Sequence, residues 1–280
     1  MEKLNYLNLG CGAKFHKAWV NVDIAPSDPA VIKKDLLKGI DFPDNTFDVI
    51  YHCQVIEHIP KNNVSFFIQE CYRVLKPEGI IRIVAPDLEN IAKNYLSRLD
   101  KCLEAPDEMN VANYDWMVLE MYDQTVRSSV GGNMGRLFGT DNLLNEQFIL
   151  ERTGFSGKVL RTQFTAKQVQ QGLLQRVKSK SLKQIIHAVI EKIDRGFLKA
   201  LLSKKKMEYL ELGKFRMSGE IHYWMYDRFS LTRLLQESGF RNISLKNPFS
   251  SNIPNFDSYE LDVKNGIAFD PTALFIEGIK

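Results

Sequence analysis

Two glycines and two aspartates near the N-terminus are spaced as a nucleoside-binding site requires. Gly10 and Gly12 follow the apolar run at residues 6–9, Asp23 ends a second such run, and Asp35 ends a third. Glycine lets the backbone approach a ligand closely, and a carboxylate at a strand end can accept hydrogen bonds from ribose hydroxyls or an adenine amino group. Each residue alone fits a tight turn or a helix cap equally well. Together they predict a nucleoside pocket.

Three further residues could move a proton. His58 follows a fourth apolar run, and a neutral imidazole is available as a base near pH 7. His58 also fits a packed or capping position in the turn before Pro60. His222 and Asp227 are second candidates, although Asp227 also fits the cap of a following helix. Such a base is needed if a hydroxyl bound at this site must lose its proton.

The elements that position these residues alternate between strands and connections. The apolar, β-branched runs predict buried strands, and helical spacing predicts a helix over residues 63–75 before the turn at 76–79. Strand, helix and strand in this order make a parallel crossover and therefore an α/β sheet. The five strands are expected at residues 6–9, 19–24, 31–35, 47–53 and 80–84.

The pattern becomes helical after Pro86 and returns to strands only near the C-terminus. A helix is expected over residues 231–237, and strands over 242–246 and 273–279. This order predicts one α/β domain, residues 1–86 and 220–280, interrupted by a helical insertion at 87–219. Because the insertion leaves the sheet where ligands bind, it is expected to cap the acceptor site.

The ordered motifs resemble the class I S-adenosylmethionine-dependent methyltransferases, particularly the type 11 group. The resemblance covers residues 4–88 well and 220–280 more loosely, and it implies a Rossmann-like seven-stranded sheet that ends in an antiparallel hairpin. It also implies S-adenosylmethionine as the cofactor and an enzyme that transfers its methyl group. The resemblance runs through LNLGCG at 7–12, VDI at 22–24, KDL at 34–36, FPDNTFDVI at 42–50, VIEHI at 55–59 and RVLKPEG at 73–79.

By position, the resemblance implies a role for each cofactor-site residue. Gly10, Cys11 and Gly12 would border the methionine part, and Asp23 would hold the ribose. The adenine would lie against Ile24, Asp35 and Leu36, and the sulfonium near Gln54 and Val55. Two departures stand out. Asn8 replaces the acidic residue that the family often has two positions before the first glycine. An amide can accept a hydrogen bond from the methionine ammonium but cannot neutralise it, so either the affinity is lower or another group compensates. The six residues between Gly12 and Trp19 are too few for a full helix.

Charge is concentrated in the expected insertion. Residues 158–206 hold 13 Lys and Arg against 2 Asp and Glu, whereas the whole chain has a formal net charge of +3. An apolar stripe at helical spacing accompanies the basic residues. Such a helix could contact an anionic membrane or a phosphate-bearing partner, or pack on the core with a solvated basic face. Nucleic acid is not expected, since aromatic residues are not interleaved with the basic ones. The stripe is Leu182, Ile186, Val189, Ile193, Phe197 and Leu201.

The acceptor is indicated only by resemblance. Stretches similar to residues 122–135 and 224–227 accompany type 11-like enzymes of polysaccharide and sugar biosynthesis, which implies a hydroxyl of a sugar or other small molecule. The four cysteines are not at CxxC spacing, so no zinc site is predicted. They fit a reducing cytoplasm, and neither a signal peptide nor a spanning apolar run is seen in this sequence.

Two other functions compete with methyl transfer. A nicotinamide-dependent oxidoreductase would need a third glycine where Phe15 stands, and a longer interval than the 11 residues from Gly12 to Asp23. A non-catalytic cofactor-binding scaffold is kept open by Asn8. Methyl transfer accounts for more of the ordered motifs than either alternative, and it needs no metal or covalent intermediate.

Overall fold

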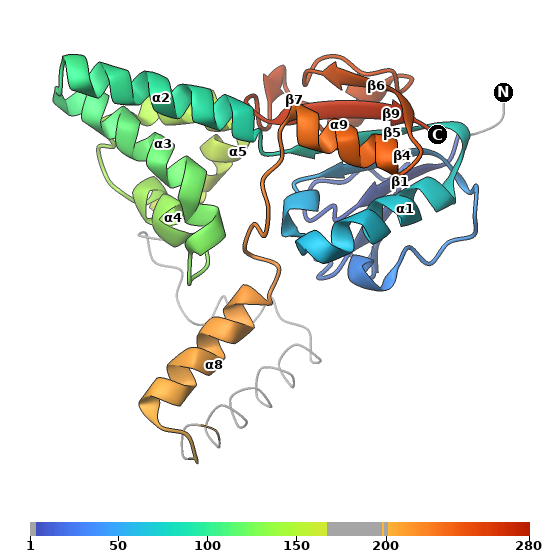
Figure 1. Cartoon of the computed structure of the whole chain (residues 1–280), viewed down its shortest axis with the longest axis horizontal. Helices are drawn as coiled ribbons and strands as arrows, with labels where there is room; N and C mark the ends of the chain where they lie inside the picture. Colours follow the sequence, from blue (N-terminus) through green and yellow to red (C-terminus); the bar gives the residue numbers. More distant parts are fainter. Residues whose placement is uncertain (1–3, 167–197, 199–200) are drawn as a thin grey trace.

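The computed structural model describes residues 4–166, 198 and 201–280. Its centre is a seven-stranded sheet in the order β3-β2-β1-β4-β5-β9-β6 (Figure 1). Strands β1 to β5 are parallel, and β9 is antiparallel to both of its neighbours. This is the Rossmann-like methyltransferase sheet that the motifs implied. The strands are β1 Tyr6–Leu9, β2 Val20–Asp23, β3 Val31–Lys33, β4 Phe47–Cys53, β5 Leu75–Ala85, β6 Arg241–Lys246 and β9 Leu274–Ile279.

Strand β5 is longer than predicted because it continues through the expected turn at 76–79. Leu75 pairs with Phe47, but the next pair joins Ile80 to Val49, so the intervening residues bulge away from β4. Glu78 has a positive φ of 65° within this bulge. Residues 76–79 therefore turn away from β4, as predicted, but strand pairing on both sides of them makes them part of one strand.

One face of the sheet is covered by α1 (Val64–Val74) and α9 (Arg228–Glu237). Both helices bury apolar side chains in the main core, Phe67 and Ile68 from α1 and Leu231 and Leu235 from α9. A hydrophobic stripe of this kind stabilises a helix mainly through its packing.

The other face is covered by the segment between β6 and β9. This segment contains η4 (Phe256–Tyr259) and the short hairpin of β7 (Val263–Lys264) and β8 (Ile267–Ala268). Its Phe256 packs against Trp19 and Tyr51. Turns alone connect β1 to β2, as the short interval predicted, so no helix there competes for this face.

A buried ion cluster fixes the same segment to the sheet. Arg82 is fully buried and donates to Asp262 and Glu277, each at 2.7 Å, and to the carbonyls of Asn247 and Ser250. Tyr51 donates to the second oxygen of Asp262 at 2.7 Å. A buried charge is tolerated when its hydrogen bonds are satisfied in this way. Arg82 lies within an apolar strand, and no sequence pattern indicated its partners.

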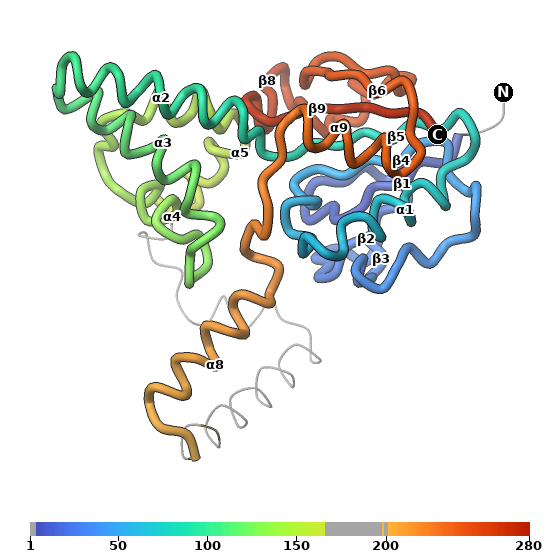
Figure 2. The backbone as a smooth tube through the Cα atoms, viewed as in Figure 1, coloured from blue at the N-terminus to red at the C-terminus, as the bar shows by residue number. Residues whose placement is uncertain are grey.

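The insertion is helical where the structure describes it, and it lies beyond the carboxyl ends of the parallel strands (Figure 2). Asp87 and Asp107 cap the first two of its helices. The predicted basic helix at 182–201 lies outside the described residues, except for Leu198 and Leu201. No described helix has the length and apolar character that crossing a membrane requires. The helices are α2 Leu88–Glu104, α3 Glu108–Val126, α4 Gly132–Phe138, α5 Glu146–Ala166 and α8 Lys204–Arg216.

His52 in β4 generates a prediction about stability. Its ring is fully buried beside Phe67, and neither nitrogen has a partner in the described part of the chain. Burial lowers the pKa of His52 to about 3. The unfolded chain binds a proton near pH 6.5 and the folded chain does not, so the stability is present above that pH and is lost as the pH falls below it.

Between pH 6.5 and pH 4.5, His52 should contribute a slope of roughly 1.4 kcal/mol per pH unit to the free energy of unfolding. Denaturant unfolding of the wild type and of His52→Leu over this range measures the difference between the two slopes. The variant should show the flatter dependence, whatever its absolute stability. Parallel curves would contradict a neutral, buried His52.

Candidate functional site

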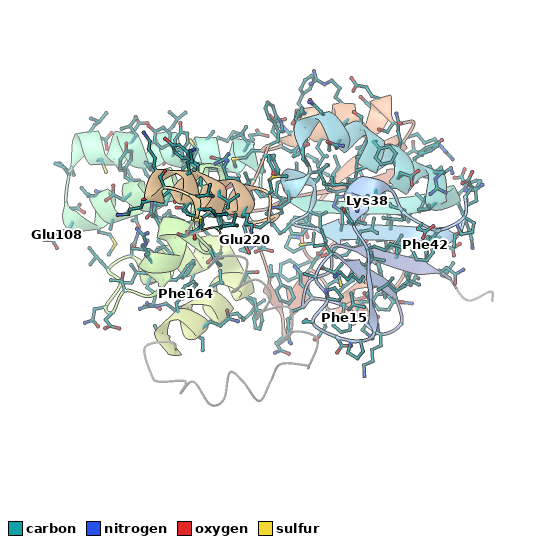
Figure 3. All side chains as sticks on the ribbon, turned by 90° about the horizontal axis from the view of Figure 1, so that it is seen from below. Phe15, Lys38, Phe42, Glu108, Phe164 and Glu220 are labelled. Carbon is teal, nitrogen blue, oxygen red and sulfur yellow. The ribbon has the colours of Figure 1, made fainter. Side chains whose placement is uncertain are left out.

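A cavity of about 550 Å³ lies between the carboxyl edge of the sheet and the helical insertion. Side chains from both regions line it, which agrees with the rule that ligands bind beyond the carboxyl ends of parallel strands. In Figure 3, Glu220 marks the junction between the two regions. From the sheet side the lining residues include Gly10, Cys11, Gly12, Lys14, Cys53, Gln54, His58, Asp270 and Thr272, and from the insertion and its return Glu120, Gln124, Thr125, Arg127, Met134, Phe138, Arg152, Glu220, His222 and Met225.

The loop after β1 requires its glycines. Gly10 and Gly12 have φ values of 62° and 53°, in the left-handed region that glycine adopts most readily. A Cβ atom at Gly10 would come within 2.5 Å of the Val55 side chain. Val55 therefore packs directly beneath the loop, whereas Gln54 lines the cavity beside it. Gly10 and Gly12 thus keep the backbone of the loop at the cavity wall, and their contact with a cofactor stays a prediction.

Asp23 ends β2 and is hydrogen-bonded to the same loop. One carboxylate oxygen accepts from the Gly12 amide at 2.8 Å, and the other accepts from the Ala25 amide at 2.8 Å. The next residue, Ile24, is 59% exposed. Asp23 and Ile24 thus lie at the strand end next to the glycine loop but do not line the cavity, so their contact with a ribose and an adenine stays a prediction.

Asp35 and Leu36 lie one strand further along. Asp35 does not end β3, which stops at Lys33. It caps η1 (Leu36–Lys38), and its side chain accepts from the Leu37 amide at 3.1 Å. Leu36 is buried in the core beside it. Neither residue lines the cavity, so their contact with an adenine stays a prediction.

The Asn8 side chain is hydrogen-bonded to the loop that follows β1. The side chain is buried, and its amide donates to the Asn21 side chain and to the Lys14 carbonyl, both at 3.2 Å. Asn8 does not line the cavity. Where the family often has an acidic residue, this chain has an amide, and its NH2 group donates to the backbone carbonyl of Lys14.

Lys14 and Asp270 were missed by the sequence reasoning. The Lys14 ammonium lies 3.9 Å from the Asp270 carboxylate, 3.1 Å from the Cys53 sulfur and over the Phe269 ring. Burial lowers the pKa of Lys14, but Cys53 and Asp270 outweigh it and leave that pKa raised. Burial raises the pKa of Asp270. Both side chains line the cavity with Gly10 and Gly12, and no spacing signal could have paired residues so far apart in the sequence.

His58 and His222 come together although 163 residues separate them. The Glu57 carbonyl accepts from the Tyr223 amide at 2.8 Å, and the His58 Nδ1 lies 2.9 Å from the Ile221 carbonyl. These contacts hold the segment that returns from the insertion against η2 (Ile56–His58). The two imidazole rings then lie 4.7 Å apart, edge to face, at the cavity wall.

The protonation of this cluster is set by its burial. Burial lowers the pKa of His58, and burial with smaller contributions from His58 and Arg127 lowers the pKa of His222 to about 2. Burial also raises the pKa of Glu57 to about 8. Both imidazoles are therefore neutral near pH 7. The sequence predicted two of these three residues and not Glu57.

The structure corrects the expectation for Asp227. This carboxylate accepts from the Ser230 amide at 2.7 Å, forms a capping box and begins α9. Those hydrogen bonds with the Ser230 backbone lower the pKa of Asp227. It does not line the cavity, so the capping alternative, and not the proton-transfer one, describes this residue.

The helical wall of the cavity is polar and held by ion pairs. Arg152 donates twice to Glu120, at 2.6 and 2.7 Å, and also to Asn90. Arg127 contacts the carbonyl of Glu220. A bidentate Arg–carboxylate pair is rigid, so these side chains present fixed donors and acceptors to the cavity.

The glycine-rich segment after α3 forms a turn that leads into α4. Gly131 and Gly132 have positive φ values of 78° and 56°. Asp123 accepts from the Asn133 amide at 2.7 Å and packs directly against Gly132. This contact begins α4, whose Met134 reaches the cavity.

Comparison with known proteins agrees with this geometry. Residues 7–83 match a family model described as a methyltransferase domain, of type 11. No curated protein matches the sequence.

Several solved structures are similar. A SAM-dependent methyltransferase from Archaeoglobus fulgidus is 12% identical over 99% of this chain and 86% of its own, with a TM-score of 0.38. A SAM-dependent methyltransferase from Thermotoga maritima, described as a possible histamine N-methyltransferase, is 11% identical over 100% and 84%, with the same TM-score of 0.38. A SAM-dependent methyltransferase from Aquifex aeolicus is 20% identical over 31% and 58%, with a TM-score of 0.25.

The matched residues include those that line the cavity after β1 and β4, namely Gly10, Cys11, Gly12, Lys14, Cys53, Gln54 and His58. Residues 7–83 therefore form a domain similar to the methyltransferase domains of the type 11 group.

Proposed function

We propose that this enzyme methylates a hydroxyl of a sugar or another small polar molecule held in the cavity between the sheet and the helical insertion. The observation that carries the proposal is the cavity itself, because its walls come from the cofactor-binding strand ends on one side and from polar helical residues on the other. The region 1–86 with 220–280 then binds the cofactor, and 87–219 is the cap that binds the acceptor.

The cofactor is proposed to lie along the ends of β1, β2 and β4. Asp23 binds the ribose hydroxyls, since its carboxylate stands at the strand end beside the glycine loop. Ile24, Asp35 and Leu36 border the adenine, and Gly10, Cys11 and Gly12 border the methionine chain. The sulfonium lies near Gln54, so its methyl group points into the cavity.

Lys14 and Asp270 are proposed to bind the charged end of the methionine part. That end is a zwitterion, with an ammonium and a carboxylate on one carbon. A cationic and an anionic side chain 3.9 Å apart at the cavity wall offer one partner for each group. In this way Asp270 supplies the negative charge that Asn8 lacks.

The acceptor is proposed to bind against the helical wall. Gln124, Thr125, Arg127 and the Glu120–Arg152 pair offer the hydrogen bonds that a molecule with several hydroxyls requires. Most of the rate then comes from holding the acceptor oxygen in line with the sulfonium methyl group.

A hydroxyl must also lose its proton as it attacks. His58 is the candidate to receive it, because Nδ1 is occupied by the Ile221 carbonyl and no described residue occupies Nε2. His222 stands beside it at the same wall. No covalent intermediate is needed, since the transfer is a direct displacement at the methyl carbon.

Replacing Asp23 tests the ribose site. Asp23→Ala removes two hydrogen bonds to a charged group, which are worth roughly 1.5–3 kcal/mol each, so calorimetry should show a loss of about 3–6 kcal/mol in binding of S-adenosylhomocysteine. Asp28→Ala is the matched control, because Asp28 accepts from the Ala30 amide at 2.8 Å just as Asp23 accepts from Ala25. Equal affinities in the two folded variants would exclude Asp23 from the site.

Replacing Asp270 tests the methionine end separately. Asp270→Asn should weaken S-adenosylhomocysteine by roughly 10–100-fold, the size of one charge-assisted hydrogen bond. Methylthioadenosine, which lacks the ammonium and carboxylate, should bind the variant and the wild type equally. A loss of affinity for both ligands would mean that Asp270 acts on the fold of the site and not on the ammonium.

A further inference from the structure

The buried carboxyl group of Glu57 has no hydrogen-bond partner in the described part of the chain. Its side chain is fully buried, and neither oxygen finds a donor among the described residues. Leaving a buried carboxylate without partners is costly, and such groups are normally paired or bound to a metal. Its backbone is well satisfied, since the carbonyl accepts from Tyr223 and Trp224. The side chain therefore needs an explanation that the fold does not give.

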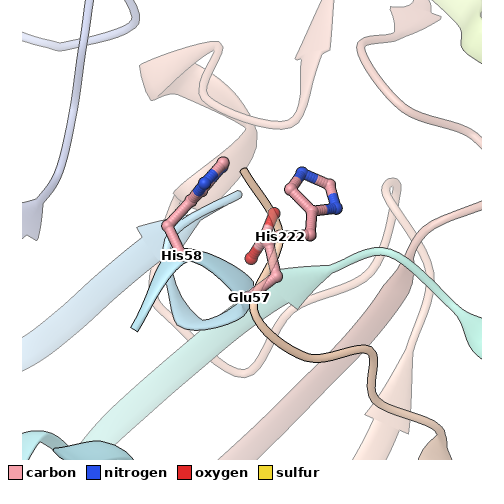
Figure 4. Close-up of side chains that lie close together, drawn as sticks. All are labelled: Glu57, His58 and His222. Carbon is pink, nitrogen blue, oxygen red and sulfur yellow. The ribbon is translucent and has the colours of Figure 1, made fainter. Parts of the chain in front are cut away.

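Two neutral imidazoles lie next to this carboxylate. One ligand atom each from Glu57, His58 and His222 can be chosen so that all three lie within 4.8 Å of one another. Figure 4 shows the carboxylate pointing between the two rings. Two imidazoles and a carboxylate are a donor set that Zn²⁺ and other divalent transition metals take.

We propose that Glu57, His58 and His222 bind one divalent transition-metal ion at the wall of the cavity. Metal–ligand bonds of about 2.0–2.2 Å place the ligand atoms of one ion roughly 3–4 Å apart, so modest side-chain rotations complete the site. The Ile221 carbonyl fixes the His58 ring through Nδ1, as an outer-shell partner commonly does, and leaves Nε2 for the metal.

The proposed ion would face the cavity and could bind a molecule there. His58 and His222 line the cavity, whereas Glu57 lies behind them. Three protein ligands leave a coordination position open to the cavity, as in catalytic zinc sites. That position suits an acceptor hydroxyl or thiolate. A bound metal would lower the pKa of such a hydroxyl or of a thiol, so that the proton could pass to solvent water without a protein base.

Metal binding is tested on the full chain without cofactor. Protein freed of metal with a chelator is titrated with Co²⁺, whose visible absorption reports the ligands, and then with Zn²⁺ as competitor. The wild type should bind one equivalent of Co²⁺, and Zn²⁺ should displace it. The spectrum should lack the near-ultraviolet band of a cobalt–thiolate bond. No stoichiometric binding, or a thiolate band from Cys53 or Cys11, would overturn the proposal.

Two variants and a control locate the site. Glu57→Gln keeps the shape of the side chain and is neutral, so it should fold, and His222→Ala removes one imidazole. Each should weaken Co²⁺ binding by at least the roughly 10–100-fold that loss of an outer-shell partner costs. His16→Ala removes a histidine outside the cluster and should bind as the wild type does. Wild-type affinity in Glu57→Gln would contradict the assignment.

Thermal unfolding gives a second readout. A metal that binds only the folded chain raises its melting temperature, so Zn²⁺ should stabilise the wild type and not Glu57→Gln. An equal rise in both would overturn the proposal even if His222→Ala failed to fold. The inference rests on the side-chain geometry and not on the proposed function, and cofactor affinity measured on the same samples separates failure of one from failure of the other.

Discussion

The hydrogen bonds between the turn after β4 and the segment returning from the insertion hold the two walls of the cavity together. The Glu57 carbonyl accepts from Tyr223, and His58 contacts the Ile221 carbonyl. At the other end of the same segment, the Leu88 amide donates to the Tyr226 carbonyl at 2.8 Å. The insertion therefore enters and leaves the sheet at one place. Its helices are held over the carboxyl edge of the strands by backbone hydrogen bonds at Glu57 and Leu88 and by the contact of the His58 side chain with Ile221.

The short connection between β1 and β2 has consequences far along the chain. Without a helix there, one face of the sheet is covered by the segment between β6 and β9, which the buried Arg82 cluster ties down. That segment carries Asp270 to the cavity, opposite Lys14. In the proposed cofactor site, Asp270 would supply the negative charge that Asn8 lacks.

Much of the fold could be predicted because its signals are local. Buried parallel strands read as apolar runs, so β4 was predicted at its observed bounds, and the final hairpin followed from the family resemblance. The glycine loop and Asp23 were also local signals. Other features depend on tertiary contacts between residues that are distant in the sequence, and motif spacing does not predict such contacts. These features are the pairing of His58 with His222, the pairing of Lys14 with Asp270 and the isolation of the Glu57 side chain. The sequence around Asp227 fitted both a proton-transfer role and a helix cap, and the hydrogen bond from the Ser230 amide shows that Asp227 is a helix cap.

The proposed cofactor site lies between the glycine loop and the helical wall, with the cofactor's sulfur facing the cavity. The most direct measurement is a crystal structure of the protein with S-adenosylhomocysteine. The account predicts the ribose on Asp23, the amino acid end between Lys14 and Asp270, and the sulfur beside Gln54 facing His58 and His222. A ligand bound in another place, or bound here with its amino acid end away from Lys14 and Asp270, would contradict it.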